Sequence, residues 1–167
     1  MAGNRRIDRI LDPSFLQGLE DAALETIRDK RDETAEEEAV LSYERSLIHS
    51  RIRLLQAAQE LRANAAPPSS IIDRLPEILA DTNVTHRGSF PSLEPPQMTD
   101  HPRRRVEKLI TDDTLARIHD LSDEDIAATI EALETAEREV SDNRRSVHVV
   151  LDRIITEIGR RKAGADV

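Results

Sequence analysis

Residues 22–64 contain neither proline nor glycine, and apolar side chains recur along them every seven residues. A segment of this length without helix breakers predicts one continuous helix of about 60 Å, at 1.5 Å per residue. The seven-residue frame is Ile27, Thr34, Leu41, Ile48 and Leu55, and a second line follows Leu24, Arg31, Glu38, Arg45, Ile52 and Gln59. This spacing is typical of a coiled-coil seam that carries polar residues.

A second long helix is predicted from about Asp123 to Arg161. Ser122 and Asp125 form a capping pattern at its start. The seam residues are Ile126, Leu133, Val140, Val147 and Ile154, which alternate with Ile130, Glu137, Arg144, Leu151 and Ile158. Two long helices with an intervening turn can pack antiparallel. The fold expected is therefore all-α, an antiparallel coiled-coil hairpin, with short helices and an irregular linker between the two long helices.

The whole chain, residues 1–167, is interpreted as a single helical-hairpin domain. Residues 1–21 are expected to be a flexible leader, 22–64 the first long helix, and 65–110 a proline-containing linker with short helical pieces. Residues 111–162 are expected to hold a short helix, capped by Thr111 and running to about His119, followed by the second long helix. The basic cluster Arg103–Arg105 in the linker is interpreted as solvated.

The composition narrows the class of protein. The chain has only three aromatic residues and a formal net charge of −9, which fits helices with a narrow apolar seam and argues against general nucleic-acid binding. It has no cysteine, no apolar N-terminal signal and no membrane-spanning stretch, so a cytoplasmic location is expected. The acidic segment Glu20–Glu38 is expected to be either a solvated face or a surface for a basic partner.

Both long helices carry the same polar pattern. Glu38, Ser42, Arg45, His49 and Arg53 in the first helix have the spacing of Glu137, Ser141, Arg144, His148 and Asp152 in the second. At about 100° per residue these positions fall within a stripe about 80° wide, so each copy lies on one helix face. Internal duplication of polar residues points to a shared task for the two copies.

One task is structural. In an antiparallel pair Glu38 would face Arg144 and Arg45 would face Glu137, and polar seam residues of this kind fix the register of two helices. A metal site using His49, His148 and Asp152 is disfavoured, because Arg53 and Arg144 would stand beside the metal. Hydrolysis is disfavoured as well, since the stripe shows no strained nucleophile turn and no oxyanion donors, and no catalytic residue is predicted.

Recognition of a guanine nucleotide fits these side chains better. Arginine donates in a fork to guanine O6 and N7, and a carboxylate accepts from guanine N1–H and its exocyclic amine. Serine hydroxyls and histidine N–H groups suit phosphate oxygens. Two copies on facing helices would form a pseudo-symmetric site for a two-fold-symmetric guanine nucleotide.

At these residues the chain resembles the RsiG-type anti-sigma factors of actinobacteria. Their signature is Glu-x3-Ser-x2-Arg-x3-Gln-x3-Asp on each of two antiparallel helices, with histidine sometimes replacing glutamine. Leu41-Ser42-Tyr43 before Arg45, and Arg144-Arg145 before His148, match the surrounding sequence, as do Glu157-Ile158 and Arg160-Arg161. The resemblance covers about residues 22–64 and 104–162.

The resemblance implies a non-enzymatic cytoplasmic protein that binds cyclic di-GMP as its regulatory ligand, with no metal. So loaded, it would sequester a sigma factor of the sporulation or flagellar (motility) class, without binding DNA or membrane. Each motif copy would form one nucleotide half-site. Arg53 replaces the motif's aspartate, so the first half-site is expected to bind more weakly, to bind in another pose or to use Arg53 on phosphate. The alternative is a sigma-binding or scaffolding coiled coil without nucleotide dependence.

Overall fold

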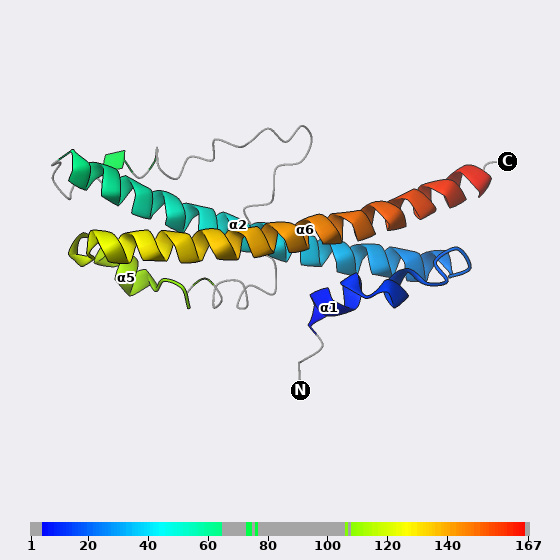
Figure 1. Ribbon diagram of the computed structural model, residues 1–167. Coiled ribbons are helices and arrows are strands. Elements are labelled where there is room, and N and C mark those ends of the chain that lie inside the picture. Colours follow the sequence, from blue (N-terminus) through cyan, green and yellow to red (C-terminus); the bar gives the residue numbers. More distant parts are fainter. Residues whose placement is uncertain (1–4, 65–72, 75, 77–105, 107, 166–167) are drawn as a thin grey trace. The chain divides into compact units, whose positions relative to one another are not determined.

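The structure is a computed structural model that describes residues 5–64, 73–74, 76, 106 and 108–165. Within this part of the chain all regular elements are helical (Figure 1). The long helices are α2 (Leu24–Ala63) and α6 (Asp123–Ala165). The short ones are α1 (Arg6–Leu11), η1 (Pro13–Leu16), α5 (Asp112–Ala116) and η2 (Ile118–Asp120). The predicted all-α class is confirmed.

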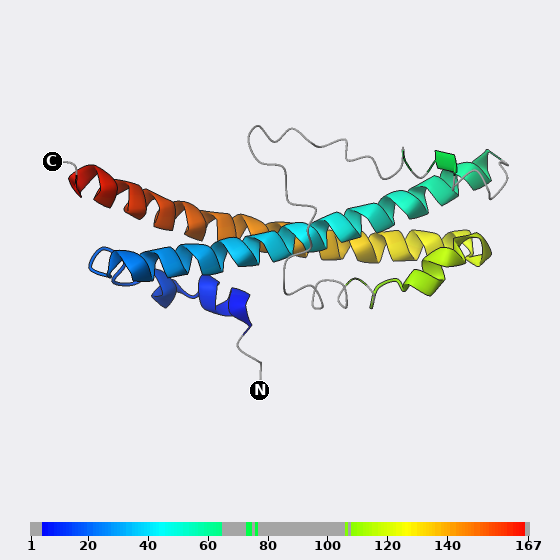
Figure 2. The ribbon, with the colours of Figure 1, turned by 180° about the vertical axis from the view of Figure 1, so that it is seen from behind.

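The chain divides into two compact units, and both long helices contribute to each. Unit 1 consists of Met1–Ser42 with Val140–Val167, and unit 2 of Tyr43–Glu139. In unit 1, Arg161 near the end of α6 donates to the carbonyl oxygen of Ala22, just before α2 begins. In unit 2, Arg62 near the end of α2 forms an ion pair with Asp123, the first residue of α6. The helices therefore run antiparallel within each unit, as predicted (Figures 1 and 2).

The predicted seven-residue frames form the cores of both units. None of their members is more than 3% exposed. Unit 1 holds Ile27, Thr34, Leu41, Val140, Val147 and Ile154, and unit 2 holds Ile48, Leu55, Ile126 and Leu133. The second line of each helix, which includes the glutamate and the arginine of each polar stripe, is largely half-buried beside this seam. The coiled-coil interpretation is thus correct for both helices, and burying each of these large apolar side chains contributes about 1.5–3 kcal/mol.

The helix starts follow the predicted caps. The Ser122 hydroxyl accepts a hydrogen bond from the Asp125 amide at 3.0 Å, and Thr111 accepts one from the Thr114 amide at 3.0 Å. The ends differ by a few residues from the prediction. The short helix stops at Ala116 and continues as η2, and α6 extends to Ala165 because no proline follows Arg161 to end it.

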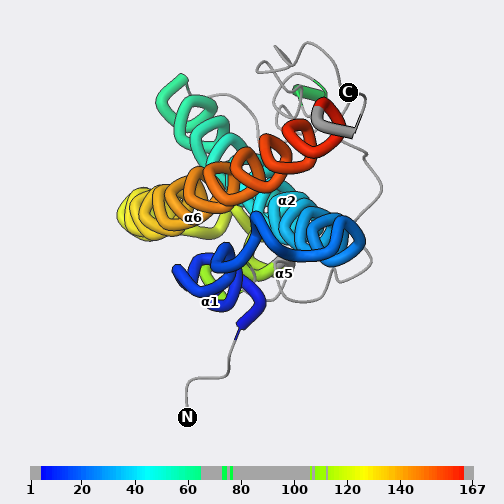
Figure 3. The backbone as a smooth tube through the Cα atoms, turned by 90° about the vertical axis from the view of Figure 1, so that its right-hand side faces the viewer, coloured from blue at the N-terminus to red at the C-terminus, as the bar shows by residue number. Residues whose placement is uncertain are grey.

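The N-terminal segment differs from the flexible leader expected for residues 1–21. From Arg5 onward it contains α1 and η1, which lie against the first part of α2 in unit 1 (Figure 3). Ile10 is fully buried, and Phe15 and Leu19 are at most 9% exposed. Gly18 turns the chain with φ +66°, a backbone angle that glycine adopts without strain. These apolar residues are too few and too widely spaced to show a period in the sequence.

The expected linker, residues 65–110, lies mostly outside the described residues, and so does the basic cluster Arg103–Arg105. Within the described part of the chain, no helix combines the length and the apolarity needed to cross a membrane.

Candidate functional site

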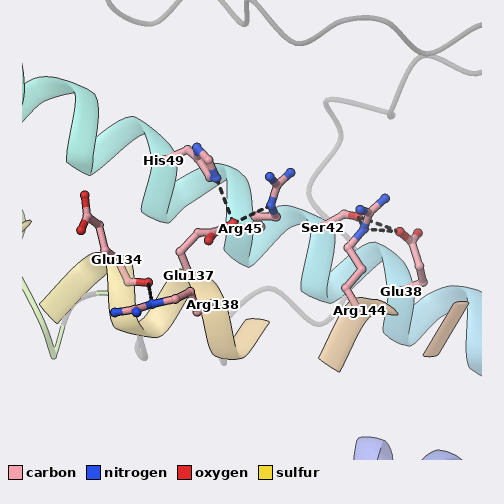
Figure 4. A network of polar contacts seen from close by, with 8 residues as sticks. All are labelled: Glu38, Ser42, Arg45, His49, Glu134, Glu137, Arg138 and Arg144. Carbon is pink, nitrogen blue, oxygen red and sulfur yellow. Dashed lines mark hydrogen bonds and ion pairs between the residues drawn. The ribbon is translucent and has the colours of Figure 1, made fainter. Parts of the chain in front are cut away.

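Unit 1 contains a cluster of hydrogen-bonded polar residues centred on Glu38, here called the Glu38 cluster. Arg144 Nε donates to Glu38 Oε1 and to Ser42 Oγ, both at 2.8 Å. The Ser42 hydroxyl donates in turn to Glu38 Oε1 at 2.8 Å. His148 Nε2 lies 3.2 Å from the same carboxylate oxygen. Figure 4 shows that the Arg144 side chain reaches α2 from α6.

Unit 2 contains the matching Glu137 cluster. Arg45 Nε donates to Glu137 Oε1 at 2.9 Å, and His49 Nε2 lies 3.2 Å from that oxygen. Here the carboxylate belongs to α6, whereas the arginine and the histidine project from successive turns of α2 (Figure 4). The two clusters have the same chemistry with the helices exchanged.

The clusters confirm the predicted ion pairs and show how the motif copies combine. Glu38 pairs with Arg144, and Arg45 pairs with Glu137, as expected for antiparallel helices in this register. Each cluster takes its glutamate from one motif copy and its arginine and histidine from the other. Each motif copy was expected to form one half-site, whereas in the structure residues of the two copies meet across the helices.

The carboxylates are more covered than the arginine and histidine side chains around them. The side chains of Glu38 and Glu137 are 21% and 20% exposed, whereas those of Arg45 and His148 are 39% and 42% exposed. Partial burial strengthens a charge-assisted hydrogen bond relative to one in full solvent. Each cluster thus holds an arginine by its Nε group while part of the side chain meets solvent.

The remaining motif residues are Ser141, Arg53 and Asp152. Ser141 and Arg53 are half-buried and have partners of their own. Asp152 is exposed and lines an open cavity of about 650 Å³ in unit 1. Its other lining residues are Leu16, Gly18, Leu19, Glu20, Asp21, Val149, Arg153, Thr156 and Glu157. The cavity offers a carboxylate acceptor beside apolar surface.

One polar arrangement, around Glu157 in the last turns of α6, was not predicted. Arg161 donates to the carbonyl oxygens of Leu19 and Glu20 at 2.9 and 2.7 Å. Arg160 and then Arg161, through their hydrogen bonds to Glu157, lower the pKa of that carboxyl to about 2. A sequence does not show which backbone carbonyl groups accept hydrogen bonds. Only Glu157 with its two arginines, which match the RsiG-type sequences, could have indicated this arrangement. The arrangement fastens the chain before α2 to the last turns of α6.

The described residues contain no group of three or more histidine, cysteine, aspartate or glutamate side chains placed to hold a metal ion. The polar clusters consist instead of carboxylates already bonded to arginine.

Comparison with known proteins concerns the first half of the chain. The sequence model of the RsiG-like family matches residues 13–79. The protein carries an RsiG-like segment. This segment includes α2 and the whole first motif copy, from Glu38 to Arg53. No significant similarity to a curated protein was found.

The RsiG-like match confirms the resemblance seen in the sequence over this part of the chain. The second motif copy lies beyond the matched residues, yet it supplies the arginine and the histidine of the Glu38 cluster. The RsiG-like segment therefore completes its polar cluster with residues of α6.

Proposed function

We propose that the protein is an anti-sigma factor that binds cyclic di-GMP through its duplicated polar stripe. In the nucleotide-bound form it sequesters a sigma factor of the sporulation or motility class. The observation that carries this proposal is the pair of crossed clusters, each holding an arginine on a half-buried glutamate, beside an RsiG-like match that includes all five positions of the first motif copy.

The geometry of Arg144 suits a guanine or phosphate ligand. Its hydrogen bonds to Glu38 and Ser42 both come from Nε. An arginine held by Nε has a fixed orientation, and its terminal Nη groups form a second, bidentate edge that matches guanine O6 and N7 or two phosphate oxygens. Glu38 then acts by orienting Arg144, and the guanine amide group requires a different acceptor.

Asp152 is the acceptor we assign to that task. It is exposed on α6 one turn beyond His148, and it lines the cavity of unit 1. A carboxylate at this place can accept from guanine N1–H and the exocyclic amine. Arg53 stands at the matching position of the first copy and donates instead of accepting. We therefore expect its guanine interactions to be weaker, or to be replaced by a contact to phosphate.

The regulatory step is a shift of population. Cyclic di-GMP carries two negative charges, which offset the positive charge of a cluster's arginine, Arg144 in unit 1 or Arg45 in unit 2. Binding favours the helix-pair geometry that holds the ligand, and the sigma factor recognises that geometry. The nucleotide can favour it only by the difference between its affinities for the two states.

The alternative is a sigma-binding or scaffolding coiled coil that has lost nucleotide dependence. A specific observation favours it: Glu38 and Glu137 have arginine partners within the helix pair, so these ion pairs alone can explain the duplicated residues. Arg53 in place of aspartate points the same way.

The test is binding of a labelled sigma factor of this class, followed by fluorescence anisotropy with and without cyclic di-GMP. The proposal expects nucleotide to tighten the complex at least tenfold for the wild type. Arg144→Ala should lose that effect. Arg145→Ala should keep it, because Arg145 is 79% exposed and contacts only the neighbouring Asp142 among the described residues. Equal binding with and without nucleotide would favour the alternative, and no sigma binding would overturn both.

A further inference from the structure

The outer face of α2 in unit 1 presents three carboxylates, Glu33, Glu36 and Glu37, here called the acidic face. All three are occupied by arginines of α1. Arg6 Nη1 lies 2.7 Å from Glu36 Oε2, and Arg6 Nε lies 3.0 Å from Glu37 Oε2. Arg9 forms an ion pair with Glu33. Two arginines three residues apart on one short helix thus satisfy three carboxylates on the neighbouring helix.

A small apolar contact supports these ion pairs. Ile10 is fully buried, and Phe15, in η1, is 8% exposed. The ammonium group of Lys30 on α2 lies 4.3 Å from the centre of the Phe15 ring and donates to the Phe15 carbonyl oxygen. The segment from Arg6 to Leu16 is therefore bound to α2 by charge and by two apolar side chains.

The ion pairs are open to solvent at their outer edge. The side chains of Glu36 and Arg9 are 70% and 56% exposed. Exposed ion pairs contribute little individually and weaken with salt. Because α1 is covalently linked to α2, its effective concentration at the acidic face is about 1 mM. This link contributes much of the stability of the α1–α2 contact. A contact of this kind can be displaced by a better partner.

At the inner edge of the acidic face, Glu37 needs a positively charged partner if α1 is displaced. Glu37 is 9% exposed, and burial raises its pKa while Arg6 opposes the effect. A buried carboxylate that loses its arginine is costly to keep ionised. Whatever displaces α1 must bring a positive charge to Glu37 and an apolar side chain to the place of Ile10.

We propose that α1 is a built-in competitor for the sigma factor, an inference that rests on the proposed function. The partner segment is a helix with two basic residues three or four positions apart beside an apolar residue, the chemistry that α1 itself presents. It binds the acidic face by replacing α1. The N-terminal helix thereby lowers the affinity for the partner and selects partners of this pattern.

The first experiment uses the full-length protein and a fluorescein-labelled peptide of residues 5–17, followed by anisotropy at low salt. In the wild type the tethered α1 excludes the peptide. Arg6→Ala/Arg9→Ala weakens α1 and should bind the peptide about tenfold more tightly than the wild type does. Adding Glu33→Gln, Glu36→Gln and Glu37→Gln to this variant should abolish that binding. Arg145→Ala is the control for the loss of an arginine, because Arg145 is 79% exposed on α6 and pairs with the neighbouring Asp142, so it should leave peptide binding as in the wild type.

Circular dichroism verifies that each variant retains its helices. If Arg6→Ala/Arg9→Ala does not fold, Arg9→Ala alone should shift peptide binding in the same direction by about threefold. The proposal is overturned if the wild type and the folded Arg6→Ala/Arg9→Ala variant bind the peptide with equal affinity. In that case α1 does not compete for the acidic face.

The second experiment measures sigma factor binding by the same proteins. Arg6→Ala/Arg9→Ala should bind the sigma factor about tenfold more tightly than the wild type, and the control Arg145→Ala should match the wild type. Unchanged sigma affinity together with a positive peptide result overturns the competition. Failure of every protein, wild type included, to bind the sigma factor overturns the proposed function as well, and the peptide result then still reports on α1 alone.

Discussion

The ion pair between Arg45 and Glu137 provides a quantitative test of the register of unit 2. Its atoms are 2.9 Å apart, and the two side chains are 39% and 20% exposed. Arg45→Glu would place two carboxylates together, and at ~4 Å and an effective dielectric constant of ~20 their repulsion is about 4 kcal/mol. Solvent and salt reduce this figure because Arg45 is more than a third exposed. We expect a loss of about 1.5 kcal/mol in the free energy of unfolding, and a similar loss for Glu137→Arg.

The double charge swap, Arg45→Glu with Glu137→Arg, should recover most, but not all, of the summed loss of the two single variants. The exchanged charges attract each other again, whereas His49, which lies 3.2 Å from Glu137 Oε1 in the wild type, would then stand beside a cation. We expect the double variant to lose about 1 kcal/mol, which corresponds to a coupling free energy of about 2 kcal/mol.

Urea unfolding followed by circular dichroism at 222 nm measures these values. Additive losses in the double variant would refute the argument that this pair fixes the register. The same variant bears on function. If the stripe binds cyclic di-GMP, the swap should restore stability and lose the nucleotide, while retained binding would favour a purely structural role.

Three further predictions concern the core, a cap and pH. Leu133→Ala should lower the free energy of unfolding by about 3 kcal/mol, because the side chain is fully buried, while Val149→Ala, at a site 53% exposed, should change it little; urea unfolding compares the two. Ser122→Ala should cost about 1 kcal/mol in the same assay by removing the cap of α6. The folded pKa of Glu157 is lowered from 4.5 to about 2, so its contribution is present above pH 4.5 and is lost as the pH falls toward 2. Melting temperatures measured from pH 5 to pH 2 should fall less steeply for Glu157→Gln than for the wild type.

The long helices and their seams could be predicted because the signal repeats many times. Ile27, Leu41 and Ile48 lie in one frame over a segment without proline, and one register buries every member of that frame. The helix ends were less certain, since α6 continues past Arg161 where no residue stops it. The packing of Phe15 depends on a short segment without periodicity, so only the structure shows it.

The pairing of glutamate with arginine across the two long helices was predicted from the sequence. The pair of Glu38 with Arg144 follows from an antiparallel register, because the motif copies are equally spaced. The ion pairs of Arg6 with the acidic face could not be predicted, because the sequence of this face fits a solvated surface or a partner site equally well. Nothing in the residues shows that the protein's own N-terminal helix covers it.

The most direct test of the account is a calorimetric titration of the full-length protein with cyclic di-GMP. The account predicts saturable binding that is weakened at least tenfold in Arg144→Ala, unchanged in the exposed neighbour Arg145→Ala and tightened in Arg53→Asp, which restores the missing acceptor. Binding that is equal in the wild type and in Arg144→Ala, or absent from the wild type and from Arg53→Asp alike, would contradict the assignment of the duplicated stripe as a nucleotide site.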